Sequence, residues 1–115
     1  MNKKFYTSFF ARKMKDPKAV CIAVSAPKGY KGNAYPELMP TWELVKDYKD
    51  GKINEQEYEK RYFDLLKSRK ITVDKIVNDL EDESILLCWE APNKFCHRNL
   101  IANWLKAAGT EVEEI

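Results

Sequence analysis

Short hydrophobic runs alternate with longer amphipathic stretches along this chain. Residues 4–10 are rich in Phe, Tyr and Thr, residues 19–24 form an unbroken apolar run, and residues 84–89 form a third run, so each predicts a strand. A continuous apolar run is typical of a strand that is covered on both faces of a parallel sheet. A last alternating stretch at 110–114 predicts an edge strand.

The stretches between these runs have the spacing of amphipathic helices. Suitable N-cap residues, Thr41, Asn54 and Thr72, open three of the predicted helices. The final helix is predicted over 96–108, where Gly109 stops it, and Trp104 is expected to be buried against the sheet.

Strands separated by helices imply parallel pairing with right-handed crossovers. We therefore expect an α/β fold, with a small, mainly parallel sheet of about four strands flanked by helices in three layers. The 115 residues contain no repeat and no Pro/Gly/Ser-rich linker, so residues 1–115 are expected to form a single domain.

Composition narrows the function classes. Hydrophobic residues make up 44% and charged residues 33%, which is typical of a folded globular protein. The formal net charge of +2 is too small for strong non-specific nucleic-acid binding. No apolar run is long enough to span a membrane, and no export signal is recognised. The three cysteines lack the paired spacing of a disulfide framework, so a cytoplasmic protein is expected.

Ligands of parallel sheets bind beyond the carboxyl ends of the strands. The segments that follow the first three predicted strands, 10–12, 25–40 and 90–95, are therefore the candidates for a binding site. After the third predicted strand, a turn at 92–93 leads into a helix that starts with Cys96, His97 and Arg98. Glu90 lies at the end of the strand. A thiol, the only imidazole of the chain and a guanidinium therefore lie together at one helix start.

This arrangement favours either a nucleophile site or an anion pocket. The free N–H groups of a helix start favour negative charge, so Cys96 tends toward the thiolate. His97 and Glu90 are candidates for proton transfer, and Arg98 for a bidentate clamp on a phosphate or carboxylate.

Each of these residues also has an ordinary structural interpretation. Cys96 can be an inert, buried N-cap, and His97 can be a hydrogen-bonding residue without a chemical role. Arg98 can tie its helix to the preceding loop by pairing with Glu90. Cys21 and Cys88, which lie within apolar runs, are expected in the core.

Two further site types do not fit the spacing. A thiol phosphatase needs Arg six residues after its Cys, and here Lys94 follows Cys88 at that distance. A structural zinc site needs four ligands, whereas only Cys88, Cys96 and His97 are close in sequence. Adjacent Cys96 and His97 are not expected to face one metal easily. We therefore expect no metal and no cofactor.

The loop over residues 25–36 is a second candidate wall of the site. Lys28 and Lys31 are suited to a negatively charged ligand, Tyr30 to stacking on a planar one, and Arg12 follows the first strand at the same edge. The spacing of the glycines is not that of a phosphate-binding motif. A solvated loop packed through its tyrosines is the alternative.

The order Leu-Leu-Cys-Trp-Glu-Ala-Pro at 86–92, then Phe-Cys-His-Arg at 95–98, resembles the bacterial and phage proteins of domain-of-unknown-function family 488. The resemblance extends upstream through residues 6–8, 36–40, 42–44, 48–53 and 57–58, so it covers nearly the whole chain. It implies an α/β fold with a cleft around Cys96, His97 and Arg98. Many members end the second strand with Asp-Val-Arg, where this chain has Ala23-Val24-Ser25.

Two functions remain open from the sequence. The first is an enzyme that acts on a nucleotide, a modified base or another phosphorylated metabolite, with Cys96 as nucleophile. The second is a non-catalytic module that binds an anionic small molecule or a nucleic-acid end in the same cleft. The missing Asp/Arg pair favours the second, and ionisation of Cys96 well below its ordinary pKa of ~8.5 would favour the first.

Overall fold

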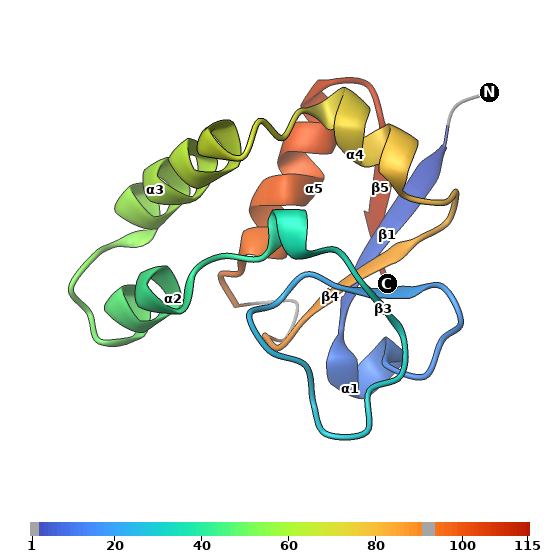
Figure 1. Ribbon diagram of the computed structural model, residues 1–115, viewed down its shortest axis with the longest axis horizontal. Coiled ribbons are helices and arrows are strands. Elements are labelled where there is room, and N and C mark those ends of the chain that lie inside the picture. Colours follow the sequence, from blue (N-terminus) through green and yellow to red (C-terminus); the bar gives the residue numbers. More distant parts are fainter. Residues whose placement is uncertain (1–2, 91–93) are drawn as a thin grey trace.

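The computed structural model describes residues 3–90 and 94–115, so the turn predicted at 92–93 lies outside the described residues. Within them, a five-stranded parallel sheet has the order β3-β2-β4-β1-β5 (Figure 1). The strands are β1 (Lys4–Phe9), β2 (Ala19–Cys21), β3 (Asn33–Ala34), β4 (Ile85–Cys88) and β5 (Glu111–Glu114). The predicted α/β fold is confirmed.

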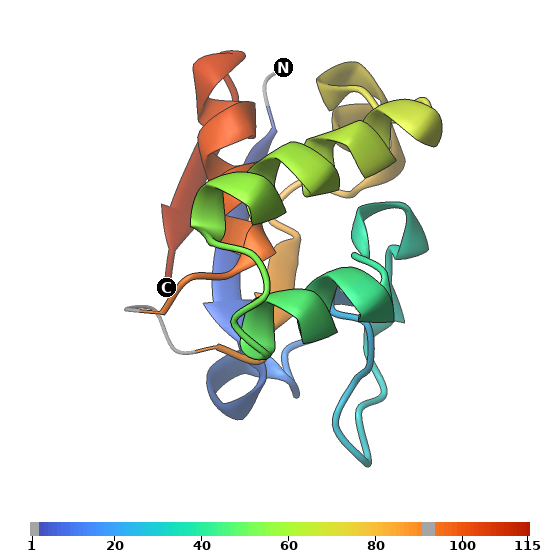
Figure 2. The same cartoon turned by 90° about the vertical axis from the view of Figure 1, so that its left-hand side faces the viewer.

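Four helices cover one face of the sheet: α2 (Trp42–Lys49), α3 (Glu55–Ser68), α4 (Val73–Asp79) and α5 (His97–Ala107). Figure 2 views the molecule from the side of α2 and α3. Alternate strand residues, including Phe5, Val20 and Leu86, pack into this main core. The residues between them, such as Cys21 and Leu87, face the short helix α1 (Phe10–Lys13) and the loop that follows β2.

The predicted helix starts are confirmed by their caps. Side-chain oxygens of Thr41, Asn54 and Thr72 accept hydrogen bonds from backbone N–H groups three residues on, at 3.2, 2.8 and 3.1 Å. These bonds satisfy N–H groups that have no partner inside the helix. Gly109, with φ of +94°, follows the end of α5 in the left-handed conformation that favours glycine.

Three short elements lie where the sequence predicted turns or loops. They are α1, β3 and a 3-10 turn, η1, over Pro36–Leu38. Elements of two to four residues are too short to produce a periodic hydrophobic pattern. The strand predicted over 19–24 ends at Cys21, although the Ile22 N–H still donates to the Leu87 carbonyl of β4 at 3.0 Å. Residues 23–25 then leave the sheet and line a cavity.

The expected burial of Trp104 against the sheet is confirmed only in part, because the side chain packs against the main core without being fully buried. Trp104 is half-buried, and its ring packs edge-to-face on Phe63 of α3, with the centroids 5.4 Å apart. The cause is its position on α5: Leu105, the next residue, is the one that points into the core.

None of the helices in the described part of the chain combines the length and the apolar character needed to cross a membrane.

Candidate functional site

A cavity of about 280 Å³ lies at the carboxyl ends of β2 and β4. Residues 23–25, which follow β2, and residues 88–90, the last residue of β4 and the two after it, form one wall. Helix α2 with the start of α3 forms another. The position follows the rule for parallel sheets, in which the chain leaves adjacent strands at the same edge.

Aromatic side chains form much of the cavity wall: Trp42, Tyr48, Tyr58, Trp89 and Phe95. The rings of Tyr48 and Tyr58 lie 5.1 and 5.2 Å from that of Phe95, so these three pack as one cluster. Trp42 and Trp89 are 61% and 51% exposed, which places indole faces at the mouth of the cavity.

The indole of Trp89 is held in place although half of it is exposed. Its Nε1–H donates to the carbonyl of Ser25 at 2.8 Å, and its ring packs edge-to-face on Phe10 at 5.2 Å. A fixed ring loses little conformational entropy when a second planar group stacks on it.

Charged residues also line the cavity: Glu90, Lys49 and Lys94. Burial raises the pKa of Tyr58, and the negative charge of Glu90 raises it further. The pKa of Tyr48 is raised by burial and, more weakly, by Glu55 and Glu90. Both phenols therefore stay protonated at neutral pH and can donate hydrogen bonds.

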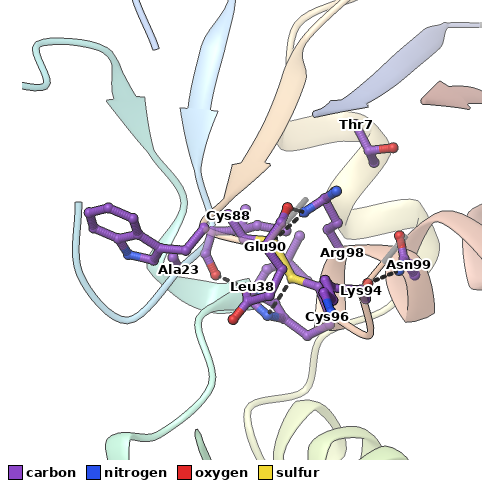
Figure 3. Close-up of a disulfide and its surroundings, with 12 residues drawn as sticks. Thr7, Ala23, Leu38, Cys88, Glu90, Lys94, Cys96, Arg98 and Asn99 are labelled. Atoms are coloured by element: carbon purple, nitrogen blue, oxygen red, sulfur yellow. Dashed lines mark hydrogen bonds between the residues drawn. A yellow bond between two sulfur atoms is a disulfide. The ribbon is translucent and has the colours of Figure 1, made fainter. Parts of the chain in front are cut away.

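Cys88 and Cys96 lie in the cavity wall and form a disulfide (Figure 3). The sequence did not predict this pair. The fold brings the two residues together because Cys88 ends β4 and Cys96 is the N-cap of α5. Cys21 is the free cysteine, and it is buried as expected.

His97 is the first residue of α5, and it is buried beside the disulfide. Its Nε2 lies 2.5 Å from the carbonyl oxygen of Ile22, which can only accept, so Nε2 carries the proton. Burial lowers the pKa of His97 to about 4, and the charge of Arg98 acts in the same direction. The ring is therefore neutral at pH 7, with a free lone pair on Nδ1, 3.6 Å from Cys96 Sγ.

Arg98 does not have the surroundings of an anion clamp. It is fully buried, and its guanidinium donates to both carboxylate oxygens of Glu114, at 3.2 and 3.0 Å. The same group donates to Cys88 Sγ at 2.8 Å and to the Glu90 carbonyl at 2.7 Å (Figure 3). These acceptors are groups of the protein itself, so Arg98 ties α5 to β4 and β5. Its charge partner is Glu114, whereas the Glu90 suggested by the sequence contributes only its backbone carbonyl.

The other predicted anion-binding residues lie away from the cavity lining. The Tyr30 ring packs on Phe10, with the centroids 5.5 Å apart, and its hydroxyl donates to Asn33. Lys31 borders a separate hollow, and Arg12 lies over the ring of Phe9. The loop that carries Lys28 packs with α1 on the face of the sheet opposite α2 and α3.

The structure thus brings Cys96, His97 and Glu90 together in one cavity, as predicted for neighbours at a strand-loop-helix junction. Sequence reasoning missed the aromatic wall. Tyr58 has the spacing of a core residue, and nothing in the local pattern shows that Trp42 and Trp89 are exposed at one opening. The one signal for a cavity residue was the position of Trp89 at the end of a predicted buried strand, where ligands of parallel sheets bind.

The family model described as "DUF488-N3a: Active DUF488-N3 subclade" matches residues 6–109. Comparisons with curated proteins and with solved structures gave no match.

Proposed function

Since the chain belongs to the DUF488 family, which the match over residues 6–109 shows, we propose that it binds a nucleobase-containing small molecule, a nucleotide or modified base, in the aromatic cavity. The observation that carries this proposal is the grouping of Trp42, Tyr48, Tyr58, Trp89 and Phe95 around about 280 Å³. This volume is close to the lower end of small-molecule sites, about 300 Å³.

The cavity has chemistry that suits each part of such a ligand. Exposed indole faces at the mouth, Trp42 and the anchored Trp89, can stack on a planar base. Lys49 and Lys94 supply positive charge for a phosphate, and the Glu90 carboxylate can accept hydrogen bonds from ring or amino N–H groups.

Tryptophan fluorescence tests the proposal directly, because two of the three tryptophans lie at the cavity mouth. Titration with nucleobases, nucleosides and nucleotides is expected to quench the emission in a saturable way for at least one class. Stacking on an aromatic ring is worth about 1–3 kcal/mol per base, so Trp42→Ala should weaken binding by about tenfold or more.

Trp104→Phe is the matched control, because Trp104 packs on Phe63 outside the cavity lining. It should keep both the affinity and most of the quenching. The proposal fails if no member of the panel binds, or if Trp42→Ala binds as tightly as the wild type.

A catalytic role is the second candidate, and one observation favours it. Cys96 Sγ lies 3.6 Å from His97 Nδ1, and both residues line the cavity in which the ligand is proposed to lie. The disulfide must be reduced before Cys96 can act as a nucleophile. Under reducing conditions, Cys96→Ser should then abolish turnover of the bound ligand, whereas Cys21→Ala should not.

A cytoplasmic location stays a prediction. The cytosol keeps most thiols reduced, which is the state that a nucleophilic Cys96 requires. Alkylation of intact cells that express the protein, followed by mass spectrometry of the 88–96 segment, tests the redox state, since an alkylated pair indicates thiols and a protected pair indicates the disulfide. Fractionation of the same cells tests the location.

A further inference from the structure

We propose that Cys88, Cys96 and His97, with the cysteines reduced, form a binding site for a borderline-soft divalent cation of the Zn²⁺ class. The two sulfur atoms and a His97 ring nitrogen all lie within 4.8 Å of one another, and all three residues are buried. Thiolate and imidazole are the ligand types that such cations prefer.

The structure removes the objection that neighbouring Cys96 and His97 cannot face one metal. Cys96 has an extended backbone, with φ of −153° and ψ of 148°, and the helix begins at the next residue. At this change of backbone the two side chains converge, with Sγ and Nδ1 3.6 Å apart. Tetrahedral Zn²⁺ with ordinary bond lengths holds a sulfur and a nitrogen ligand about 3.6 Å apart.

Hydrogen bonds around the site orient the ligand atoms as metal sites require. His97 donates its Nε2 proton to the Ile22 carbonyl, so the Nδ1 lone pair faces the sulfur atoms. A ligating histidine typically has such a partner on its other nitrogen.

The local charges also balance. Two thiolates neutralise a divalent cation, and the positive charge of Arg98 is neutralised by Glu114 at 3.0 Å. Arg98 Nη1 lies 2.8 Å from Cys88 Sγ, where it would donate a hydrogen bond to a ligating thiolate. The guanidinium therefore supports the sulfur ligand and is paired elsewhere.

The backbone leaves room between the sulfur atoms. The Cα atoms of Cys88 and Cys96 are 7.5 Å apart, beyond the usual disulfide range of about 4.4–6.8 Å.

Cation binding requires a two-electron reductant, such as a phosphine or a thiol, which converts the S–S bond and two protons into two thiols. The cation then displaces both thiol protons as the two metal–sulfur bonds form.

Three protein ligands leave one position of a tetrahedral ion unfilled, and the three residues line the aromatic cavity. Water or a bound molecule can fill that position, which is the pattern of catalytic rather than structural zinc. The inference uses the same cavity as the proposed function but does not depend on a nucleobase ligand. Cation binding is measured without any organic ligand, so the two proposals fail separately.

Co²⁺ and Zn²⁺ titrations of the full chain test the inference. After reduction with a phosphine and removal of metal with a chelator, Co²⁺ is expected to bind one per chain, with thiolate-to-cobalt charge-transfer absorption. Excess Zn²⁺ should bleach this absorption by displacement. The oxidised protein should bind neither ion, because both sulfur atoms are used in the disulfide.

Single variants identify the ligands. Cys88→Ser and Cys96→Ser should each lower the affinity by more than about a hundredfold, which is the upper end of the effect of changing an outer-shell group. Cys21→Ala is the matched control, since Cys21 is a buried free cysteine that does not line the cavity, and it should bind as the wild type does. Circular dichroism checks that each variant is folded. His97→Gln keeps both thiols, and its Co²⁺ absorption should differ from that of the wild type because one ligand is lost.

Three results would overturn the inference. They are absence of binding to the reduced wild type, equal binding to the oxidised protein, and unchanged affinity in folded Cys88→Ser and Cys96→Ser. If Cys88→Ser does not fold, unchanged Co²⁺ absorption in His97→Gln would still exclude the three-ligand site.

Discussion

The guanidinium of Arg98 and the carboxylate of Glu114 form an ion pair, with Nη2 and Oε2 3.0 Å apart, that joins the start of α5 to the end of β5. Arg98 is fully buried in this pair, while Glu114 keeps 32% of its side chain exposed. The same guanidinium holds Cys88 Sγ and the Glu90 carbonyl, so the last strand of the sheet helps to position the cavity wall.

Replacing Glu114 should therefore destabilise the fold. Glu114→Gln leaves a buried guanidinium without its counter-charge, and breaking such a pair costs about 3 kcal/mol or more. Chemical denaturation measures the change in the free energy of unfolding. Glu113→Gln is the neighbouring control, because Glu113 pairs at the surface with Lys4 and should cost at most about 1 kcal/mol. Equal effects of the two variants would contradict the structural assignment of Arg98.

Burial of neutral His97 should make the stability of the fold depend on pH between about 4 and 6.5. Its folded pKa is about 4, whereas that of an exposed histidine in the unfolded chain is about 6.5. Between these values the unfolded state binds more protons, so the free energy of unfolding falls as pH falls from 6.5 to 4 and is unaffected by His97 above 6.5.

The full loss amounts to about 3 kcal/mol below the folded pKa. Since the chain has one histidine, His97→Gln should reduce the slope of the free energy of unfolding against pH between pH 6.5 and 4.5. This holds even if the variant is less stable at every pH. Urea denaturation at several pH values measures the slope. A variant that keeps the wild-type slope would show that His97 is not buried in its neutral form.

Trp104 should stabilise the protein mainly through α3. Trp104→Ala is expected to cost about 2–3 kcal/mol, below the 3–5 kcal/mol of a fully buried tryptophan, because the side chain is half-buried. A double-mutant cycle with Phe63→Leu should give a coupling of about 0.5–1.5 kcal/mol from the edge-to-face contact. A coupling near zero would mean that the two rings do not interact in solution.

The lysines of the cavity and of the β2–β3 loop should differ in their effect on a phosphorylated ligand. Lys49→Ala should weaken nucleotide binding more than nucleoside binding, because Lys49 lines the cavity. Lys28→Ala combined with Lys31→Ala should leave both affinities unchanged, because neither residue lines it. Fluorescence titrations measure the ratio of nucleotide to nucleoside affinity for each variant. The opposite ranking would indicate that the phosphate binds at the loop that carries Lys28 and Lys31.

Much of the fold could be predicted from the sequence because its signals are local. The oxygen of Asn54 bonds an N–H three residues away, and Gly109 ends a helix through its own backbone angle, so neither depends on distant parts of the chain. The apolar runs at 19–24 and 84–89 predicted buried strands for the same reason, since burial on both faces leaves no polar alternation. That the two strands pair with each other was decided by the tertiary structure.

The site was predicted only in part. The strand-loop-helix order by itself placed Glu90, Cys96 and His97 at one edge of the sheet. Three things depended on contacts with distant residues: the pairing of Arg98 with Glu114, the His97 proton on the Ile22 carbonyl, and the aromatic wall that α2 contributes. Sequence periodicity gives the face of a helix on which a side chain lies, but the packing of helix on sheet decides what that side chain meets.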